Sequence, residues 1–125
     1  MKGKIILLAA ALLLTSATAG LHAADVFHFA LNRSAPAADA TLAAPSEIRL
    51  WFTEAPADNS VRIRLIRAGE AVATTAVTAD PENAAVFFVK PSAPLAAGSY
   101  TVSWRGVGSD GHAVTGDFAF AVTAQ

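Results

Sequence analysis

The chain has 125 residues, of which 54% are hydrophobic and 15% are charged, and its formal net charge is −1 at pH 7. This composition excludes a disordered, solvated polymer, and the charge gives no reason to expect nucleic acid as a partner. Cysteine is absent and methionine occurs only as Met1. Thiolate-based zinc, iron–sulfur and blue-copper centres are therefore excluded, and so is a thioether site for Cu(I) once Met1 is removed.

The N-terminal residues predict a cleavable secretory leader. Lys2 and Lys4 precede an apolar run over residues 5–14, and small and polar residues follow, which is the order typical of a signal peptide. Ten apolar residues are too few to cross a bilayer, which needs about 20, so the protein is not expected to span the membrane. We expect cleavage after Ala23, with Ala19 as the competing site. This gives a signal peptide at 1–23 and an exported domain at 24–125.

Beyond the leader, alternation of apolar and polar residues predicts short β-strands rather than helices. The expected strands cover or lie within residues 27–31, 48–52, 61–65, 72–78, 85–89, 100–104 and 118–122. Seven strands in about 100 residues predict an all-β, antiparallel Greek-key β-sandwich. Four arginines are expected on the solvated faces of strands: Arg49, Arg62, Arg64 and Arg67.

The stretch SDGHAVTG (109–116) combines a turn signal with metal-binding residue types. Asp110-Gly111 favours a chain reversal between two strands, and a plain turn is one reading of this segment. In extended backbone, however, residues i and i+2 point to the same side, so Asp110 and His112 can face one ion. After removal of the leader, His28 is the one other histidine. Two imidazoles and a carboxylate suit Cu(II) or zinc.

Three stretches resemble the CopC family of small periplasmic copper-resistance proteins: HFALNRSAPAADATL (28–42), LWFTEAP (50–56) and YTVSWRGVGSDGHAVTGDFAFAV (100–122). The resemblance implies a seven-stranded sandwich related to cupredoxins and a single Cu(II) ion bound by His28, Asp110 and His112. It also implies that Glu54 supports the site by accepting a hydrogen bond from a ligating imidazole. The alternative for Glu54 is a solvated charge at a strand end.

The same resemblance implies a function in copper homeostasis and resistance. The expected protein is a monomeric periplasmic carrier or buffer of Cu(II), not an enzyme, with a CopD-like inner-membrane protein as its partner. Two alternatives are a copper-dependent oxidase of the histidine-brace type and a sandwich module without metal that serves as an interaction domain.

One departure from the family pattern affects the expected ligand set. Family members usually begin, after processing, with the ligating histidine, so that its amine also binds copper. Here Phe27 precedes His28, and signal peptidase does not cleave after a bulky aromatic residue. His28 is therefore expected to offer its ring without an α-amine. The side chain of Asp25 or the amine of Ala24 is a candidate for the vacant position.

Overall fold

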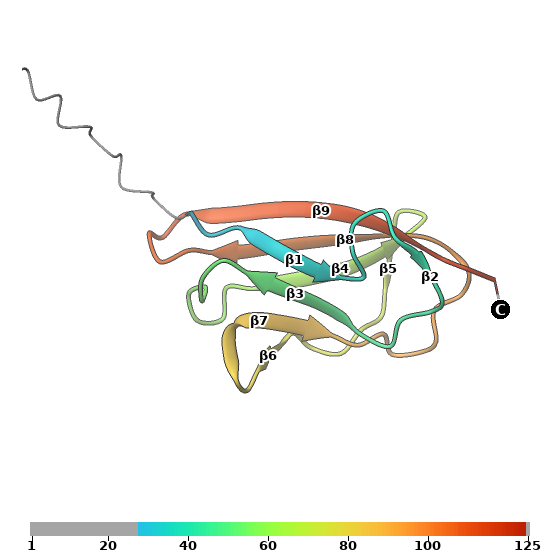
Figure 1. Ribbon diagram of the computed structural model, residues 1–125, viewed down its shortest axis with the longest axis horizontal. Coiled ribbons are helices and arrows are strands. Elements are labelled where there is room, and N and C mark those ends of the chain that lie inside the picture. The colour runs from blue at the N-terminus through green and yellow to red at the C-terminus, as the bar shows by residue number, and fades with distance from the viewer. Residues whose placement is uncertain (1–27, 125) are drawn as a thin grey trace, which may run out of the picture.

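The structure is a computed structural model in which residues 28–124 are described, and it forms two β-sheets that pack face to face (Figure 1). The four-stranded sheet has the order β1 (Leu31–Ala35), β3 (Ile48–Phe52), β7 (Asn83–Val89), β6 (Thr78–Asp80). The five-stranded sheet has the order β2 (Thr41–Leu42), β9 (Ala113–Val122), β8 (Gly98–Val107), β4 (Arg62–Arg67), β5 (Glu70–Val72). The predicted signal peptide and its cleavage site lie outside the described residues.

The predicted two-sheet, all-β sandwich is confirmed, but the strand count and some boundaries differ. Residues 28–124 contain nine strands rather than seven. The strand expected at 72–78 is wrong, because this segment crosses from the end of β5 in one sheet to the start of β6 in the other. The first strand begins at Leu31, where the expected strand ends, and Phe27 lies outside the described residues.

The sheets are also not wholly antiparallel. The two-residue strand β2 pairs in parallel with the end of β9, where the amides of Ala121 and Thr123 donate to the carbonyls of Ala40 and Leu42. A strand of two residues is too short to show a periodic pattern, so the sequence carries no signal for it.

The core lies between the two sheets and follows the predicted alternation. On β3, Ile48, Leu50 and Phe52 are buried, and on β8 Tyr100, Val102 and Trp104 are buried. Phe29 lies before β1 and outside any strand, yet it is only 2% exposed. The rings of Phe29, Phe52 and Trp104 form one aromatic cluster, with centroids 4.6 Å apart for Phe29 and Phe52 and 5.4 Å for Phe52 and Trp104. Alternation thus places one face of β3 and one face of β8 in the core.

Of the four arginines expected on solvated faces, Arg49 is the exception. Arg62, Arg64 and Arg67 are exposed, whereas the Arg49 side chain is 23% exposed. Its Nη1 donates to Asp80 Oδ2 at 2.7 Å and its Nε donates to Glu47. Arg49 therefore connects β3 to the edge strand β6 across the width of β7.

Asp80→Asn is expected to lower the melting temperature at neutral pH but not at low pH. The hydrogen bond from the Glu82 amide, and then that from Arg49, hold the pKa of Asp80 below its usual value of 3.8. A carboxylate whose pKa is lowered by folding stabilises the fold above its unfolded pKa, and this contribution disappears as pH falls through the folded pKa. The difference between wild type and variant should therefore close below about pH 4.

Circular dichroism melts of both proteins, recorded near neutral pH and near pH 3, measure this difference. Asparagine keeps an oxygen that can accept from the Glu82 amide, so the variant isolates the charge. A gap of equal size at both pH values would contradict the assignment.

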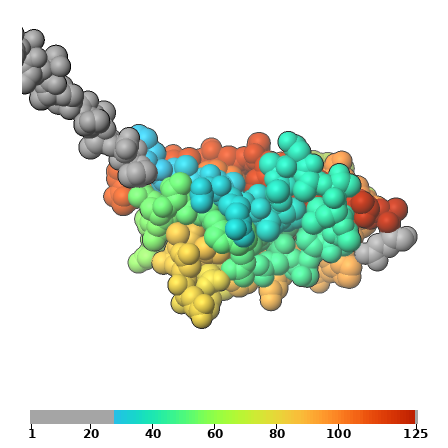
Figure 2. Space-filling view, in the orientation of Figure 1, coloured from blue at the N-terminus to red at the C-terminus, as the bar shows by residue number. Residues whose placement is uncertain are grey.

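The overall shape is an elongated body with the β8–β9 loop and the first described residues at one end (Figures 1 and 2). Within residues 28–124 no helix is long and apolar enough to cross a membrane.

Candidate metal centre

Asp110 and His112 lie in the tight loop that joins β8 to β9. The ladder between these strands ends at the pair Val107 and Ala113. Past it, the Gly108 amide donates to the His112 carbonyl and the Gly111 amide donates to the Gly108 carbonyl, both at 3.0 Å. Gly111 has a φ of +82°, a conformation that glycine adopts without steric cost. The predicted reversal at Asp110-Gly111 is confirmed.

The two side chains face each other within this loop. Asp110 Oδ1 accepts a hydrogen bond from the His112 amide at 3.0 Å, and Asp110 Oδ2 lies 3.0 Å from His112 Nδ1. The expectation rested on extended backbone, but a turn brings the side chains together instead. The backbone hydrogen bond from His112, followed by the one from its ring, holds the pKa of Asp110 below its usual value of 3.8. Asp110 is therefore an ionised carboxylate at neutral pH.

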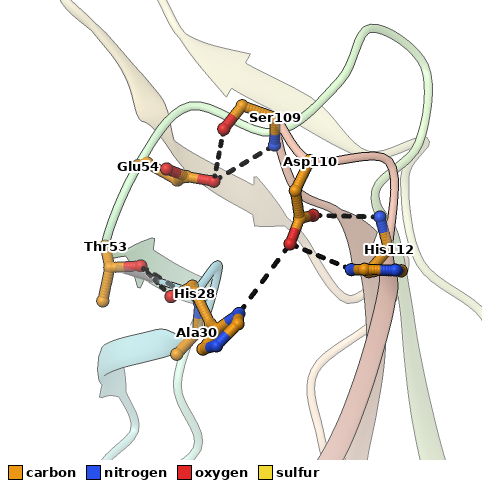
Figure 3. Close-up of polar contacts among 7 residues, drawn as sticks. All are labelled: His28, Ala30, Thr53, Glu54, Ser109, Asp110 and His112. Carbon is orange, nitrogen blue, oxygen red and sulfur yellow. Dashed lines mark hydrogen bonds and ion pairs between the residues drawn. The ribbon is translucent and has the colours of Figure 1, made fainter. Parts of the chain in front are cut away.

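His28 approaches the same carboxylate from the other end of the domain sequence. Its Nδ1 lies 3.8 Å from Asp110 Oδ2 (Figure 3). Thr53 holds the backbone at this point, because its Oγ1 donates to the His28 carbonyl at 3.2 Å and accepts from the Ala30 amide at 3.0 Å. Phe29 is buried in the core next to His28. The segment is thus attached both by hydrogen bonds and by an aromatic anchor.

Glu54 lies one residue past Thr53 and contacts the β8–β9 loop. Its Oε1 accepts hydrogen bonds from the Ser109 amide at 3.1 Å and from Ser109 Oγ at 3.2 Å (Figure 3). The expected hydrogen bond to an imidazole is not among the contacts of Glu54 within residues 28–124. Glu54 therefore contacts the residue before Asp110 and holds the loop.

Gly108 explains how closely these groups gather, and the sequence reasoning missed it. A Cβ at this position would lie 2.8 Å from Phe29 Cβ, 3.1 Å from Asp110 Oδ1 and 3.2 Å from Glu54 Oε1. Any larger residue would push the loop away from the segment that carries His28. The sequence shows a glycine next to a turn, but two of its three neighbours, Phe29 and Glu54, come from distant segments and could not be predicted from it.

The two tryptophans of the chain lie in different surroundings. Trp104 is 7% exposed and belongs to the aromatic cluster, with its ring 6.4 Å from that of Phe29. Trp51 lies under the guanidinium of Arg33 at 4.0 Å. Trp104 therefore supports the anchor of His28 from within the core, and Trp51 packs on a sheet face.

The donor set fits a metal ion of intermediate hardness such as Cu(II) once the two imidazole rings turn toward one point. Asp110 Oδ2 lies between the two imidazoles, and in this arrangement no three donor side chains of residues 28–124 already surround a single point. The side chains of His28 and His112 are 71% and 81% exposed, so both rings are free to turn. Two imidazole nitrogens and a carboxylate oxygen are ligands that Cu(II) accepts.

Fold and site together define a small two-sheet β-sandwich with a histidine and carboxylate cluster at one end. Comparison with known proteins agrees: the CopC domain family matches residues 31–123. This match includes Asp110 and His112 and begins after His28. The chain is 35% identical over 105 residues to copper resistance protein C of Escherichia coli, covering 76% of this chain and 81% of that protein. It is 32% identical over 101 residues to the protein of the same name from Pseudomonas syringae pv. tomato, with 76% and 80% covered.

Comparison with solved structures also shows similarity to PcoC and CopC proteins. PcoC, described as a methionine-rich copper resistance protein from Escherichia coli, superposes with a TM-score of 0.70 at 33% identity, over 77% of this chain and 99% of that one. CopC from Methylosinus trichosporium OB3b superposes with a TM-score of 0.71 at 27% identity, over 78% and 96%. The chain belongs to the CopC family of copper resistance proteins.

Proposed function

We propose that this chain binds one Cu(II) ion through His28, Asp110 and His112 and serves as a periplasmic carrier or buffer of copper. The observation that carries the proposal is the convergence of two ring nitrogens on one carboxylate oxygen, at 3.0 and 3.8 Å, from opposite ends of the domain sequence. The relatives from Escherichia coli and Pseudomonas syringae pv. tomato are named for copper resistance.

The exposure of the site supports a carrier rather than an enzyme. Both imidazoles lie largely in solvent, so a bound ion would be open to direct transfer to another protein. Catalysis at a metal usually relies on a site that excludes water and positions a substrate. We further propose, from family resemblance, that the partner in this transfer is a CopD-like inner-membrane protein and that the signal peptide at 1–23 directs export.

Titration of the exported, metal-free protein with Cu(II) is expected to reach saturation at one ion per chain. Cu(I) should bind poorly, because the chain has no cysteine and its one methionine is Met1, while Cu(I) prefers sulfur ligands. Isothermal titration calorimetry with Cu(II), and competition with a Cu(I)-specific chelator, measure the two affinities. Absence of Cu(II) binding would instead favour a metal-free interaction module, and ascorbate-driven peroxide production by the loaded protein would favour an oxidase.

A second prediction concerns the missing α-amine. Deletion of residues 24–27, so that processing leaves His28 first, is expected to strengthen Cu(II) binding by more than about tenfold, or about 1.4 kcal/mol. An N-terminal histidine presents its amine and its ring from one residue, so the second donor arrives already tethered. Nitrogen donors also suit the tetragonal coordination of Cu(II).

Competition titration of both forms against a calibrated chelator tests this, after mass spectrometry has established each N-terminus. Equal affinities would mean either that residues 24–27 already supply an equivalent donor or that His28 does not ligate. His28→Ala in the full exported chain separates these two cases, because it weakens binding in the first and leaves it unchanged in the second.

A further inference from the structure

Three arginines lie together on the outer face of the five-stranded sheet. Arg62 and Arg64 are on β4 and Arg105 is on β8, and Arg62 is directly opposite Arg105 in the register of these strands. All three are exposed and alternate with buried residues such as Ile63 and Trp104. We call these three residues the arginine patch.

The arginine patch has no carboxylate partner within the described residues. The ion pairs among residues 28–124 lie elsewhere: they join His28 and His112 to Asp110, and Arg49 to Glu47 and Asp80. Like charges that face each other across a sheet repel, so the patch carries an uncompensated positive charge that an external anion would neutralise.

The groups around the patch define the electrostatics of this face. Arg62 Nη1 donates to the carbonyls of Asn59 and Val61, which are dipoles and not charges. Asp117 on β9 lies opposite Ser103, which in turn lies opposite Arg64. Two strand spacings, about 9.6 Å, therefore separate the Arg64 and Asp117 backbones. Asp58 is exposed and lies beside Arg62 in the adjoining groove. Two carboxylates against three guanidinium groups still leave the face positive, although the full chain has a net charge of −1.

The arginine patch lies at the same end of the sandwich as the metal centre. Arg105 is two residues before Val107, where the β8–β9 ladder ends and the loop with Asp110 and His112 begins. The loop that precedes Arg62 is attached to the same end, because the Ala57 amide donates to the Val107 carbonyl at 2.8 Å. A partner bound to the patch would therefore lie close to an exposed copper ion.

A groove of about 710 Å³ adjoins the arginine patch at Arg62. Residues 55–59 form one side of it, and its apolar lining consists largely of Val61, Val77, Ala79, Ala84 and Phe87. A groove of this kind can accept an apolar side chain that protrudes from a polypeptide. A flat layer of lipid headgroups has no such feature, so the combination of groove and patch favours a protein partner.

We propose that the arginine patch and the adjoining groove form a docking surface for an acidic polypeptide segment that carries an apolar side chain. The segment belongs to a protein that exchanges copper with this chain, and in that respect the inference deepens the proposed function. Charge complementarity at such a surface accelerates encounter and sets orientation. Because the docking residues are separate from the proposed ligands, docking can be tested without metal.

The test uses the metal-free exported protein, labelled with ¹⁵N, and two synthetic peptides. One is rich in aspartate and glutamate with a central phenylalanine, and the other has serine in place of that phenylalanine. Both peptides are expected to shift the amide resonances of Arg62, Arg64 and Arg105, and the first should also shift those of Ala57 and Ala84. Raising the salt from about 20 mM to about 300 mM should weaken both interactions, because the charges are exposed.

The patch variant carries Arg62→Gln, Arg64→Gln and Arg105→Gln. The control variant carries Arg33→Gln, Arg67→Gln and Lys90→Gln, which removes the same charge from exposed residues elsewhere. The patch variant should bind the phenylalanine peptide at least about tenfold more weakly than wild type, while the control should stay within about twofold. Circular dichroism melts confirm that both variants fold.

Three results would overturn the proposal: equal weakening in both variants, binding of the two peptides without shifts at the patch, or undiminished peptide binding by the patch variant. If the patch variant loses binding to phosphatidylglycerol vesicles but not to the peptides, the surface is a membrane contact and the proposal is also wrong. Failure of the proposed function would appear as an absence of Cu(II) binding in the titration. The docking experiment uses metal-free protein, so the two failures can be told apart.

Discussion

His112→Ala and Asp110→Ala are each expected to lower the affinity for Cu(II) by at least about 100-fold. Each substitution removes one of the three side-chain donors proposed for the site. Asp110→Ala has a second effect, because Asp110 Oδ1 also accepts from the His112 amide at 3.0 Å and orders the loop. Competition with a chelator of known Cu(II) affinity measures the loss.

Asp117→Ala provides the matched control for the carboxylate. Asp117 lies on β9, in the same hairpin, opposite Ser103 and away from the loop, so its removal changes the net charge equally without removing a proposed ligand. It should change the affinity little. Wild-type affinity in His112→Ala would contradict the proposed ligand set, and equal losses in Asp110→Ala and Asp117→Ala would show that charge alone is responsible.

Phe29→Ala is expected to lower the free energy of unfolding by about 3–5 kcal/mol. The ring is 2% exposed, and it contacts Phe52 and Trp104 in the aromatic cluster. The sheets close tightly over it, since a Cβ on Gly106 would lie 2.6 Å from the ring. Removal of the ring therefore leaves a cavity that the surrounding strands cannot readily fill.

Urea unfolding curves of wild type and variant measure this change, and Phe88→Ala serves as the control. Phe88 is half-buried on β7, beneath the guanidinium of Arg49, so its truncation should cost less. Phe29→Ala should also weaken Cu(II) binding toward the level of His28→Ala, because Phe29 anchors the neighbouring histidine. A loss of stability below about 1 kcal/mol would contradict the anchoring role.

Local patterns predicted those parts of the molecule that depend on near neighbours in the chain. Two-residue alternation identified β3, β4, β7, β8 and β9, because each strand buries one face and exposes the other. The same logic failed at 72–78, where apolar residues serve a crossover between sheets. It could not detect β2, whose two residues are ordered by the backbone of β9.

By itself, the sequence determined the turn at Asp110-Gly111 and the closeness of Asp110 to His112, because both follow from the conformation of adjacent residues. Only the tertiary structure decided which distant groups meet this loop. Packing of Phe29 between the sheets brings His28 to Asp110, and the end of β3 brings Glu54 to Ser109. Contacts between distant segments depend on how strands from two sheets are placed against each other, and the pattern within one strand carries no information about that placement.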